Sequence, residues 1–145
     1  KGAKVEHVEL VVGLDTFKPI SAENPLEHQI HTEFYNVQQE VIDACASANR
    51  VIAVGTTATR ALESAATTGA LSGRTNLFIT PGYQWKTVDM MLTNFHMPRT
   101  SLLLMVESFI GAGWRELYAA AVAEEYRFLS FGDAMLLYRV TNVPS

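Results

Sequence analysis

Apolar and polar positions along the chain change repeatedly between strand-like and helix-like periods. Residues 51–54 form a short, continuous apolar run, which is typical of a strand that is covered on both faces. Gly55 allows a sharp turn, Thr56 or Thr57 can cap a helix, and small apolar residues then recur at helical spacing up to Gly69. This pattern predicts a buried strand that leads directly into a helix.

The same criteria predict the other elements of the chain. Strands are expected over residues 5–14, 28–37, 76–80, 88–93 and 134–140, and helices over residues 38–48, 102–110 and 114–122. Residues 15–27 and 69–75 are polar or rich in small residues and predict loops, and residues 141–145 predict a tail. The order of the elements favours an α/β fold with a mostly parallel sheet flanked by helices.

Two strand-to-helix junctions carry polar side chains that are suited to bind a ligand. The first contains Thr56 and Thr57, and the second contains Asn94 and His96. Parallel strands end at one edge of a sheet, where α/β folds place their ligands, and helix N-termini favour anionic or strongly polar groups. The pattern also agrees with an ordinary strand–helix unit in which Arg60 and Glu63 lie on the polar face of the helix, away from the apolar stripe.

The string His28-x-x-His31-x-Glu33 combines residue types that bind metals. On a strand, His28 and His31 point to opposite faces and cannot converge on one ion, so the pattern does not favour a metal site. A hydrogen-bonded pair of His31 and Glu33 fits the spacing better. Such a pair can orient a general base or simply satisfy a buried histidine.

The turn at residues 81–86 carries two aromatic residues beside a cation. Tyr83 and Lys86 can stack on a base and hold a phosphate, as in proteins that bind single-stranded RNA. A loop whose aromatic residues pack beneath the domain explains the same pattern equally well.

Composition limits the class of protein. With 145 residues, of which 48% are hydrophobic and 18% charged, the chain can form one ordinary α/β domain. The net charge of −4 excludes general binding to polyanions and restricts any contact with nucleic acid to a local basic patch. A single cysteine, Cys45, fits a reducing compartment and core packing, and no run reaches transmembrane length, so a cytoplasmic protein is expected.

Six strings, in this order, resemble the S-adenosylmethionine:tRNA ribosyltransferase-isomerases of queuosine biosynthesis. They are GLDTFKP, HQIHTEFY, RVIAVGTTATRALES, PGYQWKTVD, LTNFHMPRTSLL and YRFLSFGDAML. The resemblance covers most of the chain and corresponds to the C-terminal half of that family's proteins. It implies that residues 1–145 are the C-terminal part of a larger α/β domain, whose N-terminal half and inserted β-barrel are missing here. The lack of an initiator Met agrees with a fragment, which is expected to be inactive alone if half of its site is missing.

The resemblance also implies an activity. The ribosyl part of S-adenosylmethionine is transferred to an aminomethyl-deazaguanine base in tRNA and isomerised, which yields epoxyqueuosine and releases adenine and methionine. S-adenosylmethionine is then a co-substrate, tRNA is the partner, and no metal, separate cofactor or membrane is implied.

The chemistry requires a base that removes a proton from a carbon made acidic by the neighbouring sulfonium. The candidate catalytic residues are His31, Glu33, Asp89 and His96. The co-substrate is expected at Thr56, Thr57 and Arg60, and the RNA at Tyr83, Lys86 and Arg99. Asn94 and Asp133 complete the candidate substrate-binding residues.

The first string departs from the family pattern Leu-His-Val-Gly-x-Gly-Thr-Phe-Arg-Pro. Val11 stands at the position of the histidine, Asp15 at the second glycine and Lys18 at the arginine. These differences leave two alternatives open. One is a divergent paralogue that uses S-adenosylmethionine on another acceptor, and the other is a non-catalytic module that binds a nucleoside or RNA.

Overall fold

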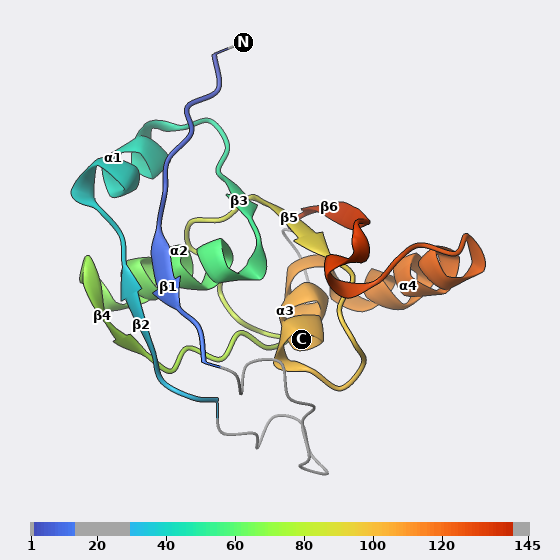
Figure 1. The fold of residues 1–145 in the computed structure, drawn as a ribbon. Coiled ribbons are helices and arrows are strands. Elements are labelled where there is room, and N and C mark those ends of the chain that lie inside the picture. The colour runs from blue at the N-terminus through green and yellow to red at the C-terminus, as the bar shows by residue number, and fades with distance from the viewer. Residues whose placement is uncertain (1, 14–29, 141–145) are drawn as a thin grey trace.

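A computed structural model describes residues 2–13 and 30–140 of the chain. Its strands and helices are interspersed along the chain, as expected of an α/β protein (Figure 1). In chain order they are β1 (Glu9–Val11), β2 (Glu33–Asn36), α1 (Gln39–Ser47), β3 (Ile52–Val54), α2 (Thr56–Thr68), β4 (Ser72–Thr75), β5 (Met90–Asn94), α3 (Ser101–Ile110), α4 (Trp114–Ala123) and β6 (Ala134–Tyr138). Short 3₁₀ turns at Gly111–Gly113 and Leu129–Phe131 flank α4 and β6.

The strands form two three-stranded sheets, and the α/β class is confirmed. One sheet has the order β1-β2-β4 and is antiparallel throughout, and the other has the order β3-β5-β6. Only β3 and β5 pair in parallel, because β6 returns antiparallel to β5. The predicted mostly parallel sheet is therefore wrong in this respect: among the described strands, the sheets are mixed.

Helix α2 is the centre of the described fold. It lies between the two sheets and contacts strands of both (Figure 1). Residues 59–65 are all buried, so the helix is covered on every side and not on one stripe alone. Arg60 and Glu63, which helical spacing places on the polar face, are 4% and 0% exposed. The prediction that this face points away from the core is wrong, since β2, β4 and the segment before β5 cover it.

Residues at the ends of α2 and α3 explain where these two helices begin and end. Gly55 has φ 94° and turns the chain from β3 into α2, and Gly69 has φ 71° and ends the helix in the left-handed conformation. At α3, the Thr100 hydroxyl accepts a hydrogen bond from the Leu103 N–H at 3.3 Å. Helices α2 and α3 therefore start or stop where a glycine permits the turn or a hydroxyl accepts a backbone N–H.

Two predicted strands differ from those observed. The strand between α2 and β5 lies at Ser72–Thr75, in the segment predicted as a loop, and not at residues 76–80. It forms because it pairs with β2, although Gly73 is a poor strand former. The second difference concerns β3, where Ala53 is buried but Ile52 and Val54 are 52% and 68% exposed. Within the described chain, the strand is thus covered on one face only.

Several predictions fall outside the described residues: the loop at residues 15–27, His28 and the tail at residues 141–145. Within residues 2–13 and 30–140, no helix is both long enough and apolar enough to cross a membrane.

Candidate functional site

The two strand-to-helix junctions meet at one edge of the β3-β5-β6 sheet, as predicted. The Gly55 N–H donates to the Leu92 carbonyl at 2.7 Å, which joins the carboxyl ends of β3 and β5. Thr56 and Thr57 open α2 directly after this bond, and no side chain caps the helix. Their N–H groups have no acceptor among the described residues, so this helix end can bind an anionic or strongly polar group.

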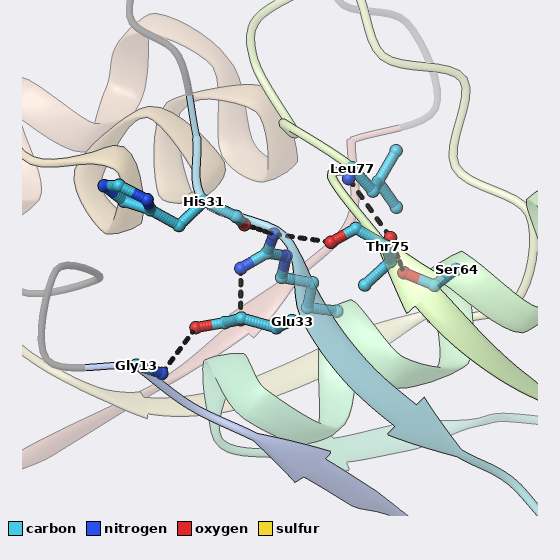
Figure 2. Close-up of polar contacts among 7 residues, drawn as sticks. Gly13, His31, Glu33, Ser64, Thr75 and Leu77 are labelled. Atoms are coloured by element: carbon cyan, nitrogen blue, oxygen red, sulfur yellow. Dashed lines mark hydrogen bonds and ion pairs between the residues drawn. The ribbon is translucent and has the colours of Figure 1, made fainter.

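A buried ion pair supports this end of α2. Arg60 Nη1 donates to Glu33 Oε2, and both side chains are at least 95% buried. The other carboxylate oxygen of Glu33 accepts the Gly13 N–H at 3.1 Å (Figure 2). Arg60 Nη2 donates to the His31 carbonyl at 3.2 Å. Burial lowers the pKa of Arg60, and the Glu33 carboxylate opposes that effect. The ion pair thus connects β2 to α2, and each charge compensates the buried charge of the other.

The ion pair lines a small cavity between α2, β1 and α3. Its polar walls are Glu33, Thr56, Thr57, Arg60 and Ser101, and its other walls are apolar. The enclosed space is about 30 Å³. That is room for one or two water molecules, whereas ligand pockets measure on the order of 300–1,000 Å³. This cavity alone is therefore too small for a ligand as large as a nucleoside.

His31 lies beside this cavity, but its ring does not join the ion pair. The residue is exposed and precedes β2. Figure 2 shows its imidazole pointing away from the Glu33 carboxylate. Its backbone carbonyl is the group that accepts the Arg60 side chain. The predicted His31–Glu33 pair is thus replaced by Arg60–Glu33, because a buried carboxylate is better compensated by a full positive charge.

His96 lies at the same sheet edge but inside an aromatic cluster. Its Nε2 is 2.8 Å from the Thr93 hydroxyl, and its backbone N–H donates to the Tyr118 hydroxyl at 2.9 Å. Phe95 packs on the rings of Tyr118 and Phe128. Burial lowers the pKa of His96 to about 4. The imidazole is therefore neutral at pH 7 and a weaker base than a free histidine.

Asn94 and Asp133 are brought together at the end of β5. The Asn94 side-chain amide donates to the Asp133 carbonyl at 3.1 Å. The Asp133 carboxylate is occupied by Arg127, whose side chain donates to it at 3.1 and 3.2 Å. Hydrogen bonds from Arg127 lower the pKa of Asp133. Asn94 is exposed, and the oxygen of its side-chain amide remains available at the sheet edge. Asp133 shapes the turn beside it.

Tyr83 and Lys86 belong to a segment that wraps around Glu63. The fully buried Glu63 carboxylate accepts the Tyr83 hydroxyl at 2.9 Å and the backbone N–H groups of Lys86, Thr87 and Val88 at 2.9–3.0 Å. Burial raises the pKa of Tyr83, and Glu63 adds to the effect. The Tyr83 ring packs against Trp85 and is half-buried. Lys86 is exposed, so it is the residue of this segment that remains available to a phosphate.

Asp89 lies at the opposite end of the sheet from Thr56 and His96. It precedes β5, where its carboxylate accepts the Val51 N–H at 2.9 Å and the Arg139 guanidinium at 3.0 Å. Asp89 and Lys86 line a separate open groove of about 630 Å³ next to α1. The candidate residues therefore fall into two groups, and the structure does not bring Asp89 to the edge that holds Thr56 and His96.

Three residues at these sites are absent from the sequence-based candidates: Gly13, Glu63 and Ser101. Gly13 acts through its backbone N–H, which no residue type reveals. Glu63 stands three residues after Arg60, and burial of both on one helix is visible only once β2 and the segment before β5 are placed. Ser101 follows Thr100, which caps α3, and this position at the start of a helix could have identified Ser101 as a candidate from the sequence.

Two further observations concern the sequence-based expectations. Within the described residues, no group of three or more His, Cys, Asp or Glu side chains is placed to hold a metal ion. Val11 is 57% exposed, and the cavity is lined by its neighbours Leu10 and Val12. Valine in place of the family's histidine therefore removes no imidazole from this cavity. Asp15 and Lys18 lie outside the described residues.

Comparison with known proteins connects this site to one family. A family model described as queuosine biosynthesis protein matches residues 1–137. A protein of Rubrobacter xylanophilus named S-adenosylmethionine:tRNA ribosyltransferase-isomerase is 52% identical over 137 residues, which are 94% of this chain and 41% of that protein. A relative of the same name from Ralstonia pickettii is 47% identical and is matched over 99% of this chain and 42% of its own length.

A solved structure has the same fold. The crystal structure of S-adenosylmethionine tRNA ribosyltransferase from Thermotoga maritima matches with a TM-score of 0.68 and 45% identity, over 72% of this chain and 40% of that one. The chain therefore spans about two-fifths of the length of the proteins it matches.

Proposed function

The chain belongs to the family of queuosine biosynthesis proteins, and we propose that it is the C-terminal part of an S-adenosylmethionine:tRNA ribosyltransferase-isomerase. The full-length protein transfers and isomerises the ribosyl moiety of S-adenosylmethionine onto an aminomethyl-deazaguanine base in tRNA and forms epoxyqueuosine. The observation that carries the proposal is the 52% identity to a relative of that name across 94% of the chain. Activity in the cytoplasm and the lack of any separate cofactor belong to the same proposal.

In this proposal the co-substrate binds at the carboxyl edge of β3 and β5. The uncapped N-terminus of α2 offers the N–H groups and hydroxyls of Thr56 and Thr57 to a carboxylate or hydroxyl group. Arg60 holds this helix end against β2 through its ion pair with Glu33. Because of that ion pair, Glu33 acts as a positioning residue and not as the base. The remaining walls come from the part of the protein outside this chain.

The proton acceptor is best assigned to His31. The residue is exposed, and the preceding residue, Ile30, lines the cavity. His96 is neutral but has a pKa of about 4, which is far below the value near 7 that suits a general base. Asp89 is held by Val51 and Arg139 at the other end of the sheet. His96 then serves to shape the edge, and Asp89 to anchor the strands.

The RNA is proposed to contact the two exposed cations Lys86 and Arg99. Lys86 precedes β5 and Arg99 follows it, so the two side chains are separated by the length of the strand and reach different phosphates. Arg99 has φ 59°, a conformation that non-glycine residues rarely adopt and that concentrates at functional sites. Tyr83 supports this surface from beneath, through its bond to Glu63.

The experiment uses the full-length protein with S-adenosylmethionine and tRNA that carries the aminomethyl-deazaguanine. Mass spectrometry follows adenine release and the modified nucleoside. Adenine and epoxyqueuosine in equal amounts support the proposal. Adenine without epoxyqueuosine overturns it in favour of another acceptor, and neither product from protein that still binds S-adenosylmethionine overturns it in favour of a binding module.

The assignment of the base is tested by His31→Gln, with His7→Gln as the matched control. Both residues are exposed histidines of the N-terminal region, but His7 lies outside the cavity. His31→Gln is expected to lower the rate of adenine release by about 10²–10⁴-fold with little change in binding of S-adenosylmethionine. Equal rates for the two variants would refute the role of His31.

A further inference from the structure

The outer face of the β3-β5-β6 sheet is apolar, and most of its positions are exposed in the described structure, although Met90 at the middle of one row is only 4% exposed. Alternate residues of the three strands point to it, and neighbouring positions are Ile52, Met90 and Tyr138 in one row and Val54, Leu92 and Leu136 in the next. Val54 is 68% exposed, Tyr138 60% and Leu136 48%. The inner face is the opposite, since Ala53, Met91, Met135 and Leu137 are at most 5% exposed.

Such a face is not expected to remain in contact with water. A parallel strand pair such as β3 and β5 occurs in sheets that are covered on both sides, and contiguous apolar patches mark interaction sites. β3 is also an edge strand of its sheet, so its free edge needs cover as well. The face therefore needs an apolar partner.

The residue types on this face favour some binding partners over others. Its outward positions carry no lysine or arginine: they are Ile52, Val54, Met90, Leu92, Asn94, Ala134, Leu136 and Tyr138. RNA is therefore a poor occupant, because its phosphates are bound by cations. The proteins that this chain matches are more than twice as long as the matched part, and about three-fifths of their length has no counterpart here. A large segment of the same polypeptide is thus available to cover the face.

We infer that the outer face of β3, β5 and β6 is an intramolecular interface, covered by the part of the full-length protein that precedes Lys1. Asn94, a candidate substrate-binding residue, lies at the carboxyl end of this same face, two positions after Leu92. The covering segment thereby reaches the edge that holds Thr56 and Thr57 and supplies walls that the 30 Å³ cavity lacks. The inference rests on the proposal that this chain is part of a longer protein, and it does not require catalytic activity.

Thiol labelling of the full-length protein tests the inference without any substrate. Leu136→Cys and Val54→Cys are introduced in a Cys45→Ser background, and Val122→Cys is the matched control. Val122 is 65% exposed on α4, comparable to Val54, but does not lie on this face. In the monomeric native protein, the thiols at positions 136 and 54 are expected to react at least about tenfold more slowly than the thiol at 122, because reaction then requires local opening.

Each other outcome overturns the inference and identifies a different occupant. Equal labelling rates at the three positions in a monomer mean that the face remains open. Protection that increases with protein concentration, together with a dimer in light scattering, means that a second copy covers it. Protection that appears only when tRNA is added means that RNA covers it. A protein that shows protection but releases no adenine would refute the proposed activity and leave this inference intact.

Discussion

Arg60 and Glu33 show how one residue at this site depends on another. Each is almost fully buried, and their contact is the most deeply buried of the described ion pairs. Loss of either partner leaves a charge in a medium that solvates it poorly. The pair therefore fixes the geometry between β2 and α2 more than it adds net stability.

We predict that Arg60→Met lowers the free energy of unfolding by about 3–5 kcal/mol, because it removes the positive charge that faces the buried Glu33 carboxylate. The measurement is urea unfolding followed by circular dichroism. Arg115→Met is the matched control, because its salt bridge to Glu107 is on the surface, with the Arg115 side chain 61% exposed, and is expected to contribute at most about 1 kcal/mol. Equal losses in the two variants would show that burial of the pair has no energetic consequence.

The buried imidazole of His96 makes stability depend on pH. Its pKa is about 4 in the folded protein and near 6.5 when unfolded. The unfolded state thus binds more protons between these values, and stability is lost as the pH falls from about 6.5 to about 4. Full protonation of this group in the unfolded state alone corresponds to about 3 kcal/mol.

We predict that His96→Gln reduces this pH dependence. The variant is less stable at pH 7, because it packs less well beside Thr93, but it loses about 2 kcal/mol less than the original protein between pH 7 and pH 4.5. Urea unfolding at both pH values gives the comparison. His7→Gln, which alters an exposed histidine, serves as the control and keeps the original dependence. An unchanged slope in His96→Gln would place the pH sensitivity elsewhere.

Among the elements, α2 organises its surroundings through its polar residues as well as its apolar ones. Glu63 holds the segment before β5 through hydrogen bonds, and Arg60 holds β2 through an ion pair. Ser64 Oγ lies 2.8 Å from Thr75 Oγ1 of β4, which in turn accepts the Leu77 N–H at 3.1 Å (Figure 2). One helix therefore sets the positions of two sheets and of the segment that presents Lys86.

We predict that Glu63→Gln loosens that segment. Both carboxylate oxygens of Glu63 accept hydrogen bonds in the original protein. In the variant, the NH₂ group of glutamine replaces one of these oxygens and cannot accept, so a buried donor loses its acceptor. The backbone amides of Lys86, Thr87 and Val88 are expected to exchange at least about tenfold faster in hydrogen exchange. Glu124→Gln, at an exposed position after α4, is the control. Unchanged protection at these three amides would show that other contacts hold the segment.

The helices were more predictable from the sequence than the strands. Helical periodicity and end signals such as Thr100 and Gly69 are local, and the four helices agree with the predicted ranges to within a residue or two. β4 was missed because its residues form a strand only through pairing with β2. The same limit applies to the site: the shared edge of Thr56 and Asn94 follows from topology, whereas the burial of Glu63 and the remote position of Asp89 depend on packing between distant segments.

At the scale of the whole molecule, the uncovered sheet face predicts opposite effects in two contexts. The double variant Val54→Lys with Leu136→Lys is expected to reduce self-association of the isolated chain, because it places charges on an exposed apolar patch. In the full-length protein, the same variant is expected to lower the free energy of unfolding by at least about 3 kcal/mol, because two buried apolar groups become charges. Light scattering and urea unfolding measure the two effects.

Val122→Lys on α4 controls for the added charge and is expected to change neither quantity appreciably. The contradictory result is a full-length double variant that is as stable as the original protein. That result would mean that the face is in contact with water in the complete protein too, and the interface proposed above would be lost.

The uncovered face also has a consequence for the order of events during synthesis. Ribosomes make chains from the amino end, at about 5–20 residues per second, and early segments begin to fold first. In the proposed arrangement, the covering segment has already emerged when β3, β5 and β6 are made, and β6 completes the face only near residue 138. The apolar surface therefore comes into existence beside its partner. A circularly permuted gene that encodes this chain first would expose the surface for many seconds and would depend on chaperones.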